Sequence, residues 1–371
     1  MEPARRDEWR VIESLLPPGW REAARTTRAF RRARYMKDPA VLARLLLFHA
    51  VNDGGLRATV AQAGAAGIAK MSQVALLKRL RTASGWLAWM SAEMCRPLRE
   101  QARLPEGLRP RAIDSTTIQG PGSAGTEWRL HYTLDLLTLA CDWHELTDAK
   151  GAELLERAPM RAGDVMLGDR NFLRPKGVLA AVNAGAHVLV RLRWSHAAMV
   201  DRDGRPYSAL RAARKLRVGQ IGEWRVRLPA LVAEDGTAID GRVVAVKLPA
   251  PLAKRAERRA TRRASKSGKR LDPRTLQAAH YVMLFTTLPK DLLAASAVLA
   301  LYRYRWQIEL AFKRLKQLLK LGRLPHQDPD AAKSWILAKM VVALLLETLY
   351  RNASVSSPWG YHLSVLESQA G

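Results

Sequence analysis

Two shortages, of cysteine and of long apolar runs, narrow what this chain can be. Its 371 residues include only Cys95 and Cys141, which have neither the spacing of a metal site nor the number needed for a disulfide framework. The longest late apolar run, Met340–Leu346, is far too short to cross a bilayer. The first residues, MEPARRDEWR, lack the apolar core of a secretory signal. We therefore expect a cytoplasmic protein that does not enter a membrane.

The motifs of several common enzyme classes are also missing. The absence of a glycine-rich loop of the Walker type argues against an NTP-driven helicase or ATPase. Neither a Gly-x-Ser-x-Gly elbow nor a zincin motif is present. The main cluster of metal-ligand residue types, Asp142, His144 and Glu145, has one histidine and two acids, which is no recognisable zinc set. We interpret this cluster as structural.

Negative charge is scarce. The chain has 34 Asp and Glu residues against 61 Lys and Arg, so its formal net charge is +27. Such an excess attracts polyanions, and nucleic acid is the usual partner at this magnitude. A peripheral membrane protein would concentrate its basic residues on one amphipathic segment, whereas here they recur throughout. Hydrophobic residues make up 48% of the chain, which is typical of globular proteins and at this length allows two or three domains.

The N-terminal part, up to about residue 105, has helical patterning. Helices are expected at Pro39–Val51 and Leu56–Ala66, and Ser72 is suited to cap a third. Helix, short glycine-containing turn and basic second helix would suit a helix-turn-helix module that binds DNA. An ordinary helical hairpin fits the same pattern, so both interpretations stay open.

The patterning then changes to that of an α/β sheet. Short apolar or alternating runs predict strands, and the segments between them predict helices. Three strands, a helix, a strand, a helix and a strand describe an α/β sheet with an antiparallel side. The expected strands are Arg111–Ile118, Trp128–Asp135, Thr138–Leu146, Val165–Gly168, Ala186–Leu192 and Tyr281–Thr287, and the expected helices are Asp148–Arg157, Lys176–Asn183 and Asp330–Tyr350.

Residues 193–278 interrupt this scheme with a mostly β insertion, in which Glu223–Leu228 and Arg242–Val246 are strand-like. Within it, Lys254–Arg270 has nine Lys or Arg in seventeen positions. This stretch is either a helix with a basic stripe or a disordered basic loop. In both cases its cations are candidates for phosphate contacts.

Two aspartates stand at strand ends. Asp114 interrupts the first strand-like run, and Asp169 follows directly after the VMLG strand. Carboxylates at strand ends converge where an active site can form. If Arg111–Ile118 and Val165–Gly168 pair as neighbours, the two carboxylates come within metal-bridging reach. Each aspartate alone could equally be a turn residue.

The stretch Leu301–Lys316 predicts one continuous helix with an apolar face and a basic face. Tyr302, Arg305, Glu309 and Lys316 fall within about 60° of one another on a helical projection. Nearby positive charge lowers the pKa of an acid and makes it a poor general base, so Glu309 is better suited to bind a metal. A solvated helix face with Glu309 paired to a lysine four residues on is the alternative.

The spacing of these four residues resembles the Tyr-Arg-Glu-Lys signature of bacterial insertion-sequence transposases of the IS-four type, a branch of the DDE transposases. Asp114 in IDSTTI and Asp169 in GDRNF match the first and second acidic motifs of that family in order and in flanking residues. One departure is Asn171, where the family usually has Gly or Ala two residues after the second Asp. Asn also tolerates left-handed backbone geometry.

The resemblance implies a ribonuclease H-like mixed-sheet core, with a helical N-terminal domain and a mostly β insertion before the glutamate helix. Asp114, Asp169 and Glu309 would bind two Mg²⁺ ions, for which Mn²⁺ would substitute. The expected parts are a DNA-binding domain at 1–105, the core at 106–192 and 279–352, the insertion at 193–278 and a tail at 353–371. Phosphate contacts are expected from Tyr302, Arg305, Lys313 and Lys316, and from Arg258, Arg259 and Arg262 of the basic stretch.

The function implied is cut-and-paste transposition on double-stranded DNA, at terminal inverted repeats and at a target. Hydrolysis at the end of the element would release a 3′-OH that then attacks the target strand, often after a hairpin intermediate. A homodimer in a synaptic complex is expected, in the cytoplasm and on the nucleoid when bound. The alternatives are an inactive or domesticated DNA-binding protein derived from a transposase, and a metal-dependent nuclease without strand transfer.

Overall fold

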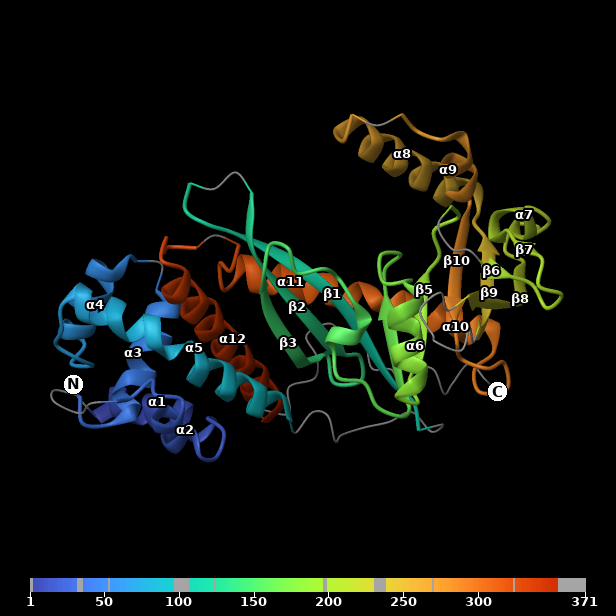
Figure 1. Ribbon diagram of the computed structural model, residues 1–371. Helices are drawn as coiled ribbons and strands as arrows, with labels where there is room; N and C mark the ends of the chain where they lie inside the picture. Colours follow the sequence, from blue (N-terminus) through green and yellow to red (C-terminus); the bar gives the residue numbers. More distant parts are fainter. Residues whose placement is uncertain are drawn as a thin grey trace. The chain divides into compact units, whose positions relative to one another are not determined.

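The structure is a computed structural model (Figure 1). It describes residues 3–31, 36–52, 54–96, 107–122, 125–195, 199–229, 238–268, 270–322 and 324–352. The expected tail at 353–371 lies outside these residues. The chain forms two compact units, which we call unit 1 (Met1–Gln101, Ser115–Gly151 and Glu309–Gly371) and unit 2 (Ala102–Asp114 and Ala152–Ile308).

Unit 1 is built mainly from helices. The longest, α12, packs against α5 and α3, and both α12 and α5 contact strand β3. Ser72 caps α5 as expected, because its hydroxyl accepts the backbone N–H of Ala75 at 3.2 Å. The elements are α1 (Pro3–Ser14), α2 (Trp20–Thr26), α3 (Pro39–Val51), α4 (Leu56–Ala65), α5 (Gln73–Cys95), β2 (Thr126–Asp135), β3 (Ala140–Asp148) and α12 (Pro329–Asn352). The part of β1 that follows Asp114 and most of α11 (Gln307–Gln317) also belong to this unit.

The connection between α4 and α5 bears on the helix-turn-helix interpretation. It runs from residue 66 to residue 72, which is longer than the three- or four-residue turn of that motif. Gly67 takes a positive φ of 67° in this turn, a conformation that glycine adopts without steric cost. The length of the connection favours the helical hairpin.

Unit 2 contains most of the sheet. Its strands lie in the order β1-β4-β5-β10-β9-β8-β6-β7, with β1, β4 and β5 parallel and β10, β9 and β8 antiparallel. The strands are β1 (Arg109–Gln119, as far as Asp114 in this unit), β4 (Asp164–Gly168), β5 (His187–Arg191), β6 (Met199–Val200), β7 (Pro206–Tyr207), β8 (Ile221–Pro229), β9 (Ala238–Lys247) and β10 (Tyr281–Thr286).

The helices of unit 2 cover and extend this sheet. Both α6 and α10 contact β5 and β9, and residues 165–168 of β4 and 188–190 of β5 are all buried, as expected for parallel strands covered on both faces. The helical elements are η2 (Leu155–Arg157), α6 (Pro175–Asn183), α7 (Ala209–Ala213), α8 (Ala250–Lys266), α9 (Pro273–Ala278), α10 (Ala295–Arg303) and η3 (Tyr304–Trp306). In unit 1, β3, β2 and β1 are neighbours in that order, so the fold is mixed α/β with a large mixed sheet.

Most expected strands and helices are present, but two predictions were wrong. Asp148–Arg157 is not an α-helix, because the Asp148 carboxylate accepts the N–H groups of Lys150 and Gly151 and turns the chain. Only the short 3₁₀ helix η2 follows. Leu301–Lys316 is not continuous either, since η3 separates α10 from α11. Three aromatic residues surround this break, and aromatic side chains lose rotamer freedom in an α-helix.

None of the helices described here is long and apolar enough to cross a membrane. This includes α12, whose apolar run the sequence marked as too short to span a bilayer.

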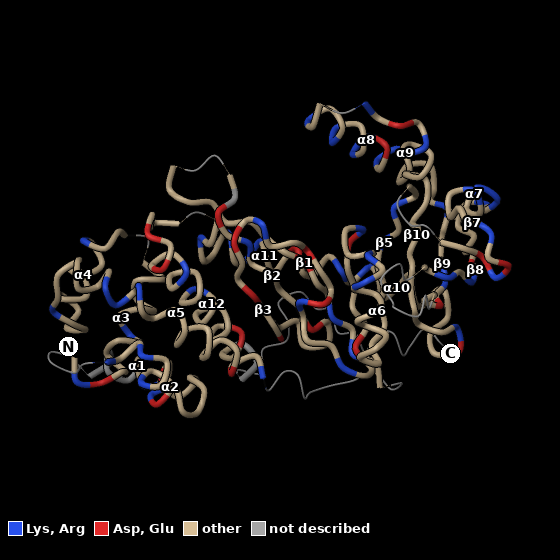
Figure 2. The backbone as a smooth tube through the Cα atoms, viewed as in Figure 1, with Lys and Arg blue, Asp and Glu red and all other residues tan. Residues whose placement is uncertain are grey.

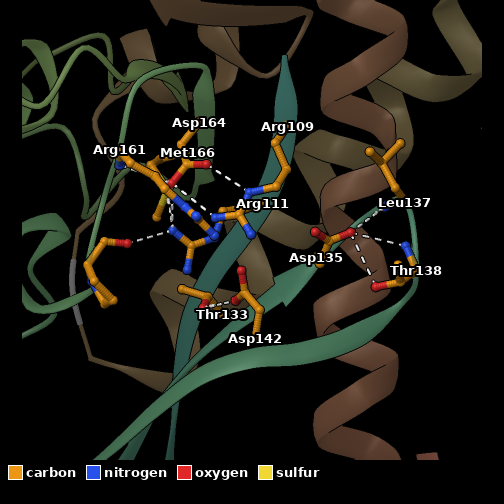
Figure 3. A network of polar contacts seen from close by, with 11 residues as sticks. Arg109, Arg111, Thr133, Asp135, Leu137, Thr138, Asp142, Arg161, Asp164 and Met166 are labelled. Atoms are coloured by element: carbon orange, nitrogen blue, oxygen red, sulfur yellow. Dashed lines mark hydrogen bonds and ion pairs between the residues drawn. The ribbon is translucent and has the colours of Figure 1, made fainter. Parts of the chain in front are cut away.

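A buried ion cluster joins the starts of β1 and β4 (Figure 3). Asp164 accepts hydrogen bonds from Arg109 Nε at 2.8 Å and from Arg111 Nη1 at 3.0 Å. Arg109 and Asp164 are also direct partners in the strand register. All three side chains are at most 2% exposed. A carboxylate shared by two buried guanidinium groups therefore fixes which residues of β1 and β4 lie opposite each other.

We expect Asp164→Asn to lower the free energy of unfolding by about 3–5 kcal/mol, because it leaves two buried guanidinium groups without their counter-charge. Urea unfolding would measure the change. Asp203→Asn is the matched control, since Asp203 pairs with Arg205 in an exposed turn and such pairs contribute little. Equal effects of the two substitutions would show that the buried cluster does not stabilise the strand pair.

Candidate functional site

The pairing of β1 with β4 brings the two predicted aspartates to the same end of these strands. Ala112 of β1 pairs with Leu167 of β4, and this is the last pair of their register. Asp114 in β1 and Asp169 in the turn after β4 each come two residues beyond that pair. The predicted pairing of these strands is thus confirmed, and both carboxylates lie at one end of the parallel part of the sheet.

Asp114 is a strand residue. It lies within β1 and is 23% exposed, so the interpretation as a turn residue does not describe it. One Asp114 oxygen is 3.8 Å from the guanidinium of Arg305, which is itself 17% exposed.

Asp169 stands in a tight turn directly after β4. Its Oδ1 accepts the backbone N–H of Asn171 at 2.7 Å, and its carbonyl oxygen accepts the N–H of Phe172 at 3.2 Å. The turn interpretation is therefore correct for this residue, but one hydrogen bond does not occupy the whole carboxylate. Before it, Gly168 has no room for a side chain, because a Cβ atom there would lie 2.8 Å from the Cβ of Phe172.

Tyr302 of α10 holds the same strand end. Its hydroxyl donates to the carbonyl oxygen of Gly168 at 3.1 Å, and the guanidinium carbon of Arg305 lies 6.0 Å from the centre of its ring, within cation–π range. Burial raises the pKa of Tyr302, the charge of Asp169 raises it further, and Arg305 and Arg191 oppose this. The phenol is therefore protonated and can donate. Two residues of the four-residue motif thus support the acidic pair.

Glu309 belongs to unit 1, in the first turn of α11. It is exposed, as are Lys313 and Lys316, whereas Ile308 and Phe312 are buried. This segment therefore has the expected division into an apolar and a polar face. Two of the three predicted acids belong to unit 2, and the grouping of all three stays a prediction.

The sequence did not reveal the arginines beside Asp169. Gly168 pairs with Val190, and Arg191 and Asp169 are the next residues along the two strands; the charges of both act on the pKa of Tyr302. Burial lowers the pKa of Arg170, and the charges of Arg191, Arg263 and Arg193 lower it further, while Asp169 opposes them. Arg191 could have been identified from the sequence because it is a charged residue at the end of a buried strand. The same pattern identified Asp169.

The basic stretch forms a helix, which decides between the two predicted conformations. In α8, Arg258, Arg259 and Arg262 are exposed, and its other cations are exposed as well. Ala253, on the opposite side, is the buried residue of the helix. Figure 2 shows the Lys and Arg positions along α8. On a helical projection the cations cover about half of the circumference, so α8 presents a wide basic face.

The competing cluster around Asp142 is structural, as expected. Thr133 donates to the buried carboxylate of Asp142 (Figure 3). The register of β2 and β3 shifts at this point, because Thr133 pairs with Trp143 and Leu134 pairs with Cys141. Asp142 is the extra residue of a β-bulge in β3, and its carboxylate accepts a hydrogen bond from the opposite strand.

The donor set of the acidic pair suits a hard cation. Carboxylate oxygens are the ligands of Mg²⁺, which binds through one or two carboxylates and completes its shell with water and substrate phosphate. No group of three or more His, Cys, Asp or Glu side chains in the described part of the chain is placed to hold a metal ion. Asp114 and Asp169 fit a cation that relies on substrate for further ligands.

Comparison with known proteins gives the family of the chain. Residues 105–346 match the family described as "Transposase DDE domain". The chain is 34% identical over 347 residues to the InsL protein of insertion sequence element IS186A from Escherichia coli K12, covering 92% of this chain and 94% of that one. It is 35% identical over 350 residues to the transposase for insertion sequence element IS421 from Escherichia coli, covering 92% and 94%.

Among solved structures, the chain is distantly similar to the piggyBac transposase in a cryo-EM synaptic complex with hairpin DNA. The TM-score is 0.45 at 10% identity, over 93% of this chain and 73% of that one.

The matched domain and the two relatives from Escherichia coli define an enzyme of the transposase and nuclease kind. The chain belongs to the DDE transposase family.

We expect Tyr302→Phe to lower the free energy of unfolding by about 1 kcal/mol, because the Gly168 carbonyl loses its side-chain donor. Thermal unfolding would measure the change. Tyr304→Phe, at the neighbouring half-buried tyrosine of η3, is the control and should unfold like the parent protein. A Tyr302→Phe protein as stable as this control would show that the hydroxyl does not hold the strand end.

Proposed function

We propose that this DDE transposase moves its element by cut-and-paste transposition and that Asp114, Asp169 and Glu309 hold the metal ions for cleavage and joining. The observation that supports the proposal is the parallel pairing of β1 with β4, after whose last pair the first two acids each follow by two residues. Glu309 is supported by its place in the motif shared with Tyr302 and Arg305, which resembles that of the IS-four type.

The chemistry divides between metal and protein. When bound, two Mg²⁺ ions would activate the attacking oxygen and stabilise the leaving oxygen of a phosphodiester. The carboxylates of Asp114 and Asp169 would hold this centre at the strand ends. Arg305, whose guanidinium lies 3.8 Å from an Asp114 oxygen, would contact a phosphate near the scissile bond. Water attack at the element's end would release a 3′-OH, which then attacks the target strand.

The rest of the expected architecture is proposed with it. A core of the ribonuclease H type is supported by the β1–β3 meander followed by the parallel strands β4 and β5. A helical N-terminal DNA-binding domain and a synaptic homodimer on two element ends are proposed from the resemblance. DNA as the partner is further supported by the names of the relatives, which are transposases of insertion sequences, and by the net charge of +27.

Incubating the protein with labelled terminal-repeat DNA and Mg²⁺ would test the proposal. We expect cleavage followed by joining to a target, and we expect Asp114→Asn, Asp169→Asn and Glu309→Ala each to reduce both steps to background while DNA binding persists. The readout is the set of cleaved and joined products on a denaturing gel.

The other outcomes separate the alternatives. Cleavage without joining would indicate a metal-dependent nuclease, and binding without cleavage would indicate a DNA-binding protein derived from a transposase. Full cleavage by Glu309→Ala would remove that residue from the metal site.

The basic face of α8 predicts the salt dependence of DNA affinity. Replacing Arg258, Arg259 and Arg262 by Ala should reduce the slope of log affinity against log salt by about 0.9 for each phosphate that the variant no longer neutralises. Fluorescence anisotropy over a salt series would measure it.

A control with the same change in charge replaces the exposed residues Arg205, Arg211 and Arg217. Its slope should match that of the parent protein. If both triple variants lowered the slope equally, the cations of α8 would contribute only general charge and would not bind the DNA backbone directly.

A further inference from the structure

Asn171 lies in the turn that follows β4, two residues after Asp169. Asparagine at a turn is often explained by its tolerance of a left-handed backbone conformation. Among the described residues other than glycine, however, only Arg28, Leu139 and Lys320 have positive φ. The backbone of Asn171 is therefore accessible to any ordinary residue, and the reason for an asparagine must lie in its side chain.

The side chain of Asn171 joins two segments that flank the Asp169 turn. Its Nδ2 donates to Glu153 Oε2 at 3.3 Å, and its Oδ1 accepts from Arg193 Nη2 at 3.3 Å. Glu153 precedes η2, and Arg193 follows the end of β5. Asn171 is exposed, so these bonds do not serve to fill a core.

The backbone of Asn171 is engaged at the same time. Its N–H donates to Asp169 Oδ1 at 2.7 Å, and its carbonyl oxygen accepts from Arg174 Nε at 3.3 Å. The residue that orients the Asp169 carboxylate is thus held by four hydrogen bonds in which it donates two and accepts two. A Gly or Ala would keep the two backbone bonds and lose both links to the neighbouring segments.

We propose that Asn171 is a positioning residue for Asp169. The carboxamide of Asn171 fixes the turn because it bridges Glu153 and Arg193. The inference rests on the proposed role of Asp169 as a metal ligand.

Two physical reasons support this role. A metal ligand must be held within about 0.5 Å of its working position by the residues behind it, and the turn after β4 has no strand partner of its own at Asp169. The carboxamide also accepts a hydrogen bond from Arg193, which holds that cation at Asn171.

The test is Mn²⁺ binding to the full-length protein without DNA, measured by isothermal titration calorimetry. Substitutions behind a metal ligand typically weaken affinity by 10- to 100-fold, and for exposed hydrogen bonds we expect about 5- to 10-fold for Asn171→Ala. Asn183→Ala, at the exposed last residue of α6, is the matched control and should bind Mn²⁺ like the parent protein.

A pair of variants at Glu153 separates the hydrogen bond from the charge. Glu153→Gln keeps an oxygen that accepts from Asn171 and should retain near-parental affinity, whereas Glu153→Ala should weaken binding as Asn171→Ala does. Thermal unfolding of each variant accompanies the titrations. A purely structural role would lower the melting temperature of Asn171→Ala and leave its Mn²⁺ affinity unchanged, and this result would overturn the inference.

Asp169→Asn distinguishes this inference from the proposed function. If Asp169→Asn weakens Mn²⁺ binding and Asn171→Ala does not, the inference fails and the metal site stands. If Asp169→Asn binds like the parent protein, Asp169 is no ligand and both fail. Weak binding by Asp169→Asn, Asn171→Ala and Glu153→Ala, with parental binding by Glu153→Gln, is the result that supports a positioning role.

Discussion

The buried carboxylate of Asp164 between Arg109 and Arg111 is the constraint on which the described part of the site depends. Buried charges are costly unless they are paired, and in the observed strand register the Asp164 carboxylate accepts a hydrogen bond from each of the two guanidinium groups. A slip of one residue would turn every side chain of a strand to the opposite face. The offset set at this cluster is kept as far as the pair of Ala112 with Leu167, two residues before Asp114 and Asp169.

The sequence predicted the strands of this region and the charged residues at their ends, because short-range patterns encode both. A buried strand appears as a short apolar run, and a charged residue at its end is visible without a structure, as for Asp169 after VMLG. The pairing of β1 with β4 could only be stated as a condition, because strand neighbours are chosen by contacts distant in sequence. The ion pair of Arg305 with Asp114 spans the chain from residue 114 to residue 305, and no local pattern announces it.

The failures have the same origin. Helical periodicity described α11 correctly, where Ile308 and Phe312 are buried on one side. It failed at η3, because periodicity does not sense the contact of Tyr302 with the strand end. At Asp148, a side chain that bonds to its own backbone competed with the helix. Tertiary contacts and local polar bonds overrode the pattern in these two places.

In the helix α8, the residue that packs against the protein and the residues that carry the positive charge are different. Ala253 is its one buried residue among those described, and its cations all face solvent. Substitutions among these cations change neither the packing of the sheet nor the alignment of the aspartates. This surface can therefore diverge between related elements at little cost in folding stability, while the strand ends beside it cannot. The helix is a part of the protein on which selection can adjust the strength of binding without altering the fold.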